Sequence, residues 1–335
     1  MPNTPANQHK TGPGTDRLGT TVWLTAQRNS RAQRTGRYLP ESVAHPAKML
    51  PAIAREAIER YTEPGDLVID PMCGIGTTLV EASHSNRRSF GVEYEPRWAQ
   101  IAEKNLAHAR TQGALGAARV VAGDARNIGE TAPPELLGTA ALVITSPPYG
   151  ASLHGQIRST AETGKRGVKK FDYTYSRDRG NLAHLPVAEL IEGFARILTG
   201  CAALLRDGGI IAITARPWRE HGAMIDLPGE VLVAGKIAGL TPVARCVALL
   251  AGIRDAGQVA RPSFFQLNNV RKAREAGEPQ SVIVHEDLIL LQKGPNPGSS
   301  GGQHADAAAL PLLYPGIEPD DADPWVDACC TSRPT

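Results

Sequence analysis

The spacing of apolar residues changes several times along the chain, and each change marks a boundary between a predicted strand and a predicted helix. Apolar runs rich in β-branched residues predict strands at 67–70, 89–92, 119–123, 140–144, 210–214, 243–250 and 281–291, the last with a bulge or turn at 285–287. Apolar residues three and four positions apart predict helices at 46–61, 77–85, 96–106, 187–205 and 229–240. Strands that alternate with helices predict a doubly wound α/β fold, with a mostly parallel sheet of about seven strands in a single domain.

The most informative stretch is the passage from the first of these strands to its helix. The strand ends in Asp70, Gly74 and Gly76 follow one residue apart, and the helical pattern begins at Thr77. Two glycines let a backbone approach a ligand where a Cβ atom would collide, and the next helix directs its N-terminal amides at the same place. The stretch therefore predicts a nucleotide-binding turn, although its spacing differs from the dinucleotide pattern Gly-x-Gly-x-x-Gly.

Polar or turn-forming residues also follow the next three predicted strands. Glu93 ends the second strand, Asp124 ends the third, and Ser146-Pro147-Pro148-Tyr149 follows the fourth. Taken alone, the two acids are equally compatible with ordinary solvated turns. The carboxyl ends of parallel strands lie along one edge of a sheet, where ligands bind in this class of fold. We therefore expect these residues to form one site with the nucleotide-binding turn.

Two motifs resemble those of a known enzyme family. Residues 70–78, Asp-Pro-Met-Cys-Gly-Ile-Gly-Thr-Thr, are similar to the cofactor loop of S-adenosylmethionine-dependent DNA methyltransferases that modify exocyclic amino groups of bases. Residues 146–149 resemble their catalytic tetrapeptide, and residues 45–49 resemble the segment that packs beside the methionine part of their cofactor. The resemblance is dense over residues 38–150. It implies one Rossmann-like methyltransferase domain over residues 38–293, with S-adenosyl-L-methionine as its cofactor.

The resemblance also implies a role for each cofactor residue. Cofactor contacts are implied for Asp70, Gly74, Gly76, Thr77, Glu93 and Asp124. Among them, Glu93 is expected to bind the ribose hydroxyls and Asp124 to meet the adenine amino group. Asp70 is expected to hold either the loop or the amine of the methionine part.

The tetrapeptide carries the implied chemistry. The exocyclic amine of cytosine or adenine is a poor nucleophile because its lone pair is delocalised into the ring, and acceptors on its N–H bonds favour the reactive geometry. In this family the acceptors are the first side chain and the first proline carbonyl, which implies Ser146 Oγ and Pro147 here. The prolines, including Pro148, stiffen the loop, and Tyr149 is expected to stack on a base that has left the duplex.

Composition limits the class of protein. A chain of 335 residues with 41% hydrophobic content can bury one substantial core. It has no apolar run of the roughly 18 residues that cross a bilayer and no signal-peptide pattern, so we expect a cytoplasmic protein without membrane contact. Its five cysteines show no Cys-x-x-Cys spacing, and the sequence predicts neither a metal site nor a disulfide framework.

Charge is distributed unevenly, although the formal net charge is only +2. Residues 1–37 predict a disordered tail that ends in a basic arm, and this arm either solubilises the chain or contacts phosphates; its arginines are Arg28, Arg31, Arg34 and Arg37. Residues 294–335 predict a second disordered tail. Insertions at 150–184 and 255–280 mix basic and aromatic residues, which suits contact with phosphates and bases.

The substrate remains open between several classes. Within the DNA family, serine at position 146 favours cytosine N4 over adenine N6, so the expected partner is nucleic acid, with DNA favoured over RNA. A tRNA guanine-N2 methyltransferase is the main alternative, because that family has a similar loop and a Pro-Pro-Tyr-Gly tetrapeptide. Its members usually carry an N-terminal RNA-binding domain, for which the residues before His45 are too few. A non-catalytic, cofactor-binding adaptor is a third possibility, and the oligomeric state and recognition sequence are not predicted.

Overall fold

The computed structural model describes residues 19–148, 156–158, 169–171, 178, 180–220, 223–255, 257–261 and 264–295. The chain divides into a unit of residues Met1–Pro295 and a unit of residues Asn296–Thr335, and all the structure described below belongs to the first. The predicted tail at 294–335 therefore lies almost wholly outside the described residues, as do Tyr149 and most of the insertion at 150–184. No helix in the described ranges is long and apolar enough to cross a membrane.

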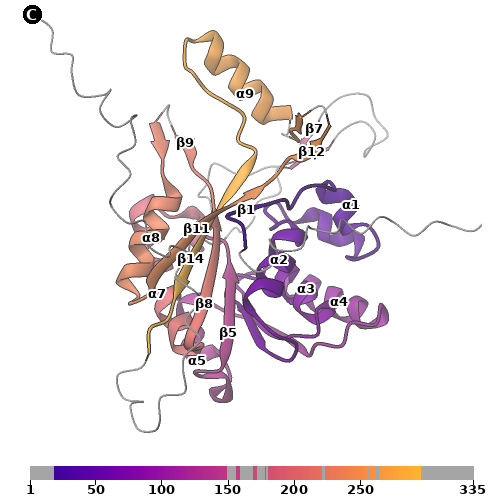
Figure 1. Cartoon of the computed structure of the whole chain (residues 1–335), viewed down its shortest axis with the longest axis vertical. Coiled ribbons are helices and arrows are strands. Elements are labelled where there is room, and N and C mark those ends of the chain that lie inside the picture. The colour runs from indigo at the N-terminus through magenta and orange to yellow at the C-terminus, as the bar shows by residue number, and fades with distance from the viewer. Residues whose placement is uncertain are drawn as a thin grey trace, which may run out of the picture. The chain divides into compact units, whose positions relative to one another are not determined.

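An eight-stranded sheet forms the centre of the described part of the first unit (Figure 1). From one edge to the other, its strands are β4 (Ala118–Ala122), β3 (Arg88–Glu93), β2 (Leu67–Asp70), β5 (Ala140–Thr145), β8 (Leu205–Ala215), β14 (His285–Gln292), β11 (Thr241–Leu249) and β1 (Val22–Trp23). Only β14 runs against its two neighbours, and all other adjacent strands pair in parallel. The predicted mostly parallel α/β sheet is confirmed, with β1 added to the seven predicted strands.

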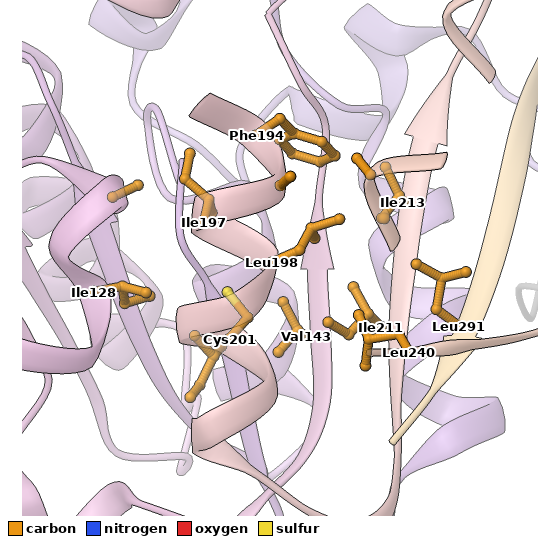
Figure 2. Close-up of a cluster of buried hydrophobic side chains, with 14 of the residues drawn as sticks. Ile128, Val143, Phe194, Ile197, Leu198, Cys201, Ile211, Ile213, Leu240 and Leu291 are labelled. Carbon is orange, nitrogen blue, oxygen red and sulfur yellow. The ribbon is translucent and has the colours of Figure 1, made fainter. Parts of the chain in front are cut away.

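Helices cover both faces of the sheet. One face packs against α2 (Pro51–Tyr61), with α3 (Thr77–His84) and α4 (Pro96–Thr111) beside it, and the other against α5 (Ile128–Thr131), α7 (Val187–Leu204) and α8 (Leu227–Ile237). Neighbouring strand residues alternate between these faces, so that Val143 belongs to the cluster with α7 and Leu142 to the cluster with α2. Figure 2 shows Phe194 and Leu198 of α7 packed over the strands. Burial on both faces explains the continuous apolar runs in the strand sequences.

The predicted disordered tail over residues 1–37 is wrong for residues 19–37. This segment contains β1, which pairs in parallel with β11, and α1 (Ser30–Arg34). Trp23 of β1 is only 1% exposed and belongs to the cluster with α2. The composition of the segment favours disorder. The prediction fails because the partners that stabilise the segment lie far along the chain, where local sequence cannot indicate them.

The same segment is fastened to α3 by a buried carboxylate. Glu81 is fully buried, and it accepts hydrogen bonds from Arg37 Nε at 2.9 Å, from Arg37 Nη2 at 2.7 Å and from the Tyr38 hydroxyl at 2.7 Å. A buried carboxylate requires such partners, since an unpaired one is costly. Arg37 of the predicted basic arm therefore has a structural role and does not face solvent as a free cation.

Two further predictions need correction in the C-terminal half of the sheet. The strand predicted from residue 281 begins at His285, and residues 285–287 pair regularly with β11 without the predicted bulge or turn. The insertion at 255–280 contains a helix, α9 (Phe264–Glu275), and part of a hairpin made by β12 (Gly252–Arg254) and β13 (Gly257–Val259). The other small elements are the hairpins β6 (Gln156–Arg158) with β7 (Lys169–Phe171) and β9 (Trp218–Glu220) with β10 (Ala223–Ile225), and the 3₁₀ helices Pro40–Ala44, Ala125–Asn127, Pro134–Leu136 and Leu182–His184.

Candidate functional site

The carboxyl ends of β2, β3, β4 and β5 surround a cavity at one edge of the sheet. The predicted site residues that line this cavity are Asp70, Gly74, Thr77, Glu93, Asp124, Ser146, Pro147 and Pro148. Gly76 is not among the lining residues, and Tyr149 falls outside the described part of the chain. The structure therefore brings the polar strand ends together, as the strand order predicted.

Asp70 fixes the turn that follows β2. Its Oδ1 accepts a hydrogen bond from the Met72 backbone N–H at 3.1 Å, and its Oδ2 accepts one from the Thr78 hydroxyl at 2.6 Å. The residue is 4% exposed, and burial raises the pKa of its carboxyl to about 6 against the opposing effect of these hydrogen bonds. The carboxylate thus ties the end of the strand to the first turn of α3.

Glu93 links the end of β3 to the same turn. Its Oε2 accepts a hydrogen bond from the Gly74 backbone N–H at 2.8 Å, and its Oε1 accepts one from the Glu95 backbone N–H at 2.9 Å. The side chain is fully buried yet borders the cavity. Two charge-assisted hydrogen bonds orient the carboxylate firmly, because each oxygen has its own backbone donor.

The fold itself requires the two glycines of the turn. Gly74 and Gly76 have φ angles of +54° and +79°, in the left-handed region that favours glycine. A Cβ atom on Gly74 would lie 3.0 Å from His45 Nε2, and one on Gly76 would lie 3.1 Å from the Cβ atom of Ala102 in α4. The sequence alone predicts that both glycines allow the close approach of a ligand. In the structure, the space that a side chain would need at either position is already occupied by protein.

Asp124 is held by an arginine that the sequence analysis did not single out. Its carboxylate accepts a hydrogen bond from the Arg126 backbone N–H at 2.9 Å and further ones from Arg126 Nε and Nη2, the shortest at 2.6 Å. Burial acts to raise the pKa of the Asp124 carboxyl, but Arg126 outweighs it and holds this pKa below its usual range. The sequence signal that could have indicated Arg126 was its position two residues after Asp124. An aspartate often accepts a hydrogen bond from the residue two positions later and so forms an Asx turn. Any ligand group that donates to Asp124 must share its carboxylate with Arg126.

A short segment from beyond the tetrapeptide completes the cavity. Residues 180–182 line it, and two side chains at the carboxyl ends of β3 and β4 hold this segment in place. The Tyr94 hydroxyl donates to Asp178 Oδ2 at 2.7 Å, and Arg126 Nη2 donates to the Gly180 carbonyl at 3.2 Å. The sequence alone predicts this part of the chain only as the end of a substrate loop. No motif marks Tyr94 or Arg126 as residues that anchor it.

The segment that precedes α2 forms a further wall of the cavity. His45 is 3% exposed, borders the cavity and meets Trp98 edge to face, with ring centroids 4.7 Å apart. Burial, together with the nearby cations Lys48 and Arg34, holds the pKa of the His45 imidazole well below its usual range, so the ring is neutral near pH 7. Arg34 Nη1 reaches Thr77 Oγ1 at 3.4 Å. A second arginine of the predicted basic arm therefore points toward the site.

β5 brings the tetrapeptide to the same cavity. It pairs in parallel with β2, so Ser146, the residue after its end, lies on the same edge as the turn after Asp70. Ser146 and Pro148 are partly exposed at the cavity, and Pro147 is buried. The described residues contain no group of three histidine, cysteine or acidic side chains that could hold a metal ion. The site thus offers oxygen acceptors and buried carboxylates.

Comparison with known proteins supports the interpretation of the turn. Residues 2–104 match a family model described as DNA methylase. Over these residues, the chain is similar to the DNA methylases. The resemblance stated from the motifs is thereby confirmed. The matched residues include the glycine turn and Glu93, and they end before Asp124 and the tetrapeptide.

Curated relatives are similar over parts of the chain only. A Type II methyltransferase, M.XycI from Xanthomonas campestris pv. cyanopsidis, is 34% identical over 79 residues, which cover 24% of this chain and 26% of the relative. A tRNA (guanine(10)-N2)-dimethyltransferase from Methanocaldococcus jannaschii is 30% identical over 132 residues, covering 38% and 37%. A 4-amino-L-phenylalanine/4-methylamino-L-phenylalanine methyltransferase from Streptomyces pristinaespiralis is 42% identical over 101 residues, covering 29% and 31%. The chain thus spans little more than a third, at most, of the length of these relatives.

Proposed function

We propose that this chain is an S-adenosylmethionine-dependent methyltransferase that acts on the exocyclic amino group of a base in DNA, with cytosine N4 favoured over adenine N6. One observation carries the proposal. A single cavity is lined both by the acids of the glycine turn, Asp70 and Glu93, and by Ser146-Pro147-Pro148. The relation to the DNA methylases supports the choice of DNA as the acceptor.

The lining of the cavity fits the cofactor. Glu93 presents a buried, pre-oriented carboxylate, which suits the two hydroxyl donors of a ribose. Asp124, shared with Arg126, offers an acceptor for the adenine amino group, and Asp70 holds the loop against α3. S-adenosyl-L-methionine, when bound, supplies a methyl group on a positively charged sulfur that leaves as a neutral thioether. Buried carboxylates around the cavity favour such a cation.

The tetrapeptide suits an amine conjugated with a ring. The Ser146 hydroxyl and the Pro147 carbonyl offer two acceptors for the N–H bonds of the acceptor amine. Hydrogen bonds to these N–H groups favour the tetrahedral nitrogen and stabilise the positive charge that develops on it during transfer. Two consecutive prolines restrict the backbone and remove N–H donors that would compete for the same oxygens.

A second candidate acceptor is a small aromatic amine. The relative that acts on 4-amino-L-phenylalanine has the highest identity of the three relatives described above, 42% over 101 residues. Its acceptor nitrogen is attached to an aromatic ring, as are the amino groups of cytosine, adenine and guanine. The same pair of oxygens can serve all these amines.

The test offers three acceptors separately: duplex DNA, tRNA and 4-amino-L-phenylalanine, each with methyl-labelled S-adenosylmethionine. We expect label in DNA, recovered as N4-methylcytosine after nucleoside analysis. Ser146→Ala should lower this rate about 100-fold or more, the effect of removing one charge-stabilising group, and leave the cofactor Kd within about twofold. Ser281→Ala, at an exposed serine that does not line the cavity, is the matched control. Label in tRNA or in the amino acid, with none in DNA, would refute the proposed substrate.

A further inference from the structure

A second polar site lies on the same side of the sheet as the cavity, where the parallel strands have their carboxyl ends. Residues 24–28 follow the carboxyl end of β1, and the hairpin β12–β13 follows the carboxyl end of β11. β1 and β11 run in the same direction as β8, β5 and β2, because β14 alone is reversed. Figure 1 shows α1 and β12 near this end of the sheet.

Two arginines from the hairpin region converge on one neutral residue, Gln27. Arg254 Nη1 donates to Gln27 Oε1 at 3.0 Å, and Arg254 Nη2 donates to the Gln27 carbonyl oxygen at 3.2 Å. Arg261 Nη2 donates to the same carbonyl oxygen at 3.4 Å. A Cβ atom on Gly252 would lie 3.1 Å from Arg261 Nη2 and 3.6 Å from Arg254 Nη1. We call Arg254 and Arg261 the Gln27 arginine pair.

The charge of the Gln27 arginine pair is not neutralised within the described part of the chain. Neither arginine forms an ion pair with a described carboxylate, although both side chains are positioned by hydrogen bonds to neutral oxygens. Both residues are exposed, so an anion can reach them. Two guanidinium groups held close together repel each other, and an anion between them relieves that repulsion.

The donor set indicates the chemistry of the anion. Guanidinium groups present planar pairs of N–H donors that match the oxygens of a phosphate, and two such groups can clasp one phosphate from both sides. The site is therefore suited to a phosphate group.

We propose that the Gln27 arginine pair binds a backbone phosphodiester of the DNA substrate beside the active site, an inference that rests on the proposed function. β11 and β1 are three and four strands from β5 in the sheet, which is about 14 to 19 Å at the usual strand spacing. That distance corresponds to a rise of roughly four to six base pairs along a duplex. A phosphate contact there fixes the position of the duplex while the target base enters the cavity, and it reads no sequence.

The test measures how salt changes binding to a labelled duplex between 50 and 200 mM, by fluorescence anisotropy. Neutralising one phosphate contributes about 0.9 to the slope of log K against log salt. The variant Arg254→Gln/Arg261→Gln should lower that slope by about 0.9, so that it loses about 3.5-fold less affinity than the parent protein over this salt range. Arg254→Lys/Arg261→Lys keeps the charge and should retain the slope with weaker binding, because the paired donors are lost.

The matched control is Arg110→Gln/Arg119→Gln. These exposed arginines lie at the end of α4 and at the start of β4, the outer strand farthest from β1 in the sheet. Their substitution removes the same amount of charge as the Arg254→Gln/Arg261→Gln variant. The proposal would be overturned if the slope of log K against log salt fell equally in both double variants. It would also be overturned if the slope did not fall in the Arg254→Gln/Arg261→Gln variant. An unchanged Kd for S-adenosylmethionine verifies that each variant is folded.

Two further measurements separate the possible failures. Inorganic phosphate that raises the melting temperature of the parent protein but not of the Arg254→Gln/Arg261→Gln variant, with an unchanged DNA slope, would identify a site for free phosphate and refute the backbone contact. Methyl transfer to DNA is measured in the same samples. Salt-dependent binding that needs the Gln27 arginine pair, without any transfer to DNA, would refute the proposed function and leave the phosphate contact intact.

Discussion

Replacing Glu93 with glutamine tests the cofactor site most directly. Both oxygens of Glu93 accept from backbone N–H groups, at 2.8 and 2.9 Å, so an amide must present its NH₂ to one of these donors whichever way it lies. Losing one charge-assisted hydrogen bond at a buried site costs about 1.5–3 kcal/mol of folding free energy. In the cofactor complex the amide also replaces one carboxylate acceptor of the ribose, so the cofactor Kd should rise about 10- to 150-fold, or 1.5–3 kcal/mol.

Isothermal titration with S-adenosylmethionine measures this Kd, and urea denaturation of the cofactor-free protein measures the loss of stability. Glu95→Gln is the matched control, because Glu95 lies two residues away and only its backbone N–H contacts Glu93 in the hydrogen bond described above. The control should leave both quantities nearly unchanged. A Glu93→Gln variant that bound the cofactor within twofold of the parent protein would show that the ribose is held elsewhere.

Two other substitutions test the turn after β2. Because burial raises the pKa of Asp70 to about 6, the carboxyl binds its proton more tightly in the folded chain than in the unfolded one, and cofactor-free stability should fall by about 3 kcal/mol as the pH rises from below 4 to above 6. Denaturation across this range should show that Asp70→Asn removes the fall, and a dependence that persists would exclude Asp70 as its source. Gly76→Ala should cost about 1–2 kcal/mol for its positive φ and about 1 kcal/mol more for contact with Ala102, whereas Gly65→Ala, with positive φ and open space, should show only the first cost. Equal losses in urea denaturation would refute the packing argument.

The sequence could predict the site because its strands end where their apolar runs end. A parallel sheet places those ends on one edge, so the side chains of Asp70, Glu93 and Ser146 had to approach one another wherever the helices lay. Apolar patterning predicted the strands themselves because both faces of the sheet are buried. The sequence could not predict the structural roles of all these individual residues. Gly76, for example, is required by its contact with α4, which cannot be recognised before the fold is known.

The basic arm illustrates the opposite case. Four arginines in close succession gave one prediction, a solvated or phosphate-binding tail, but the structure divides them. Arg34 and Arg37 are directed at Thr77 and Glu81, whereas Arg28 and Arg31 remain exposed. The buried Glu81 on α3 binds Arg37, whereas Arg34 donates to Thr77, and both contacts depend on the position of α3 in the fold. Composition alone could not distinguish arginines that stabilise the fold from arginines available to a ligand.

Described residues on both sides of the tetrapeptide's long connection to α7 lie at the cavity. Residues 146–148 leave β5 at the cavity, and residues 180–182 return to it, since both segments line it. Two side chains that follow β3 and β4 hold residues 178–180 in place: the Tyr94 hydroxyl donates to Asp178, and Arg126 donates to the Gly180 carbonyl. Arg126 also holds Asp124, the proposed adenine acceptor, so a ligand that draws on Asp124 acts on a residue shared with the far end of the insertion. From the proposed role of Asp124, we expect substitution of Arg126 to change both the affinity for the cofactor and the position of this segment.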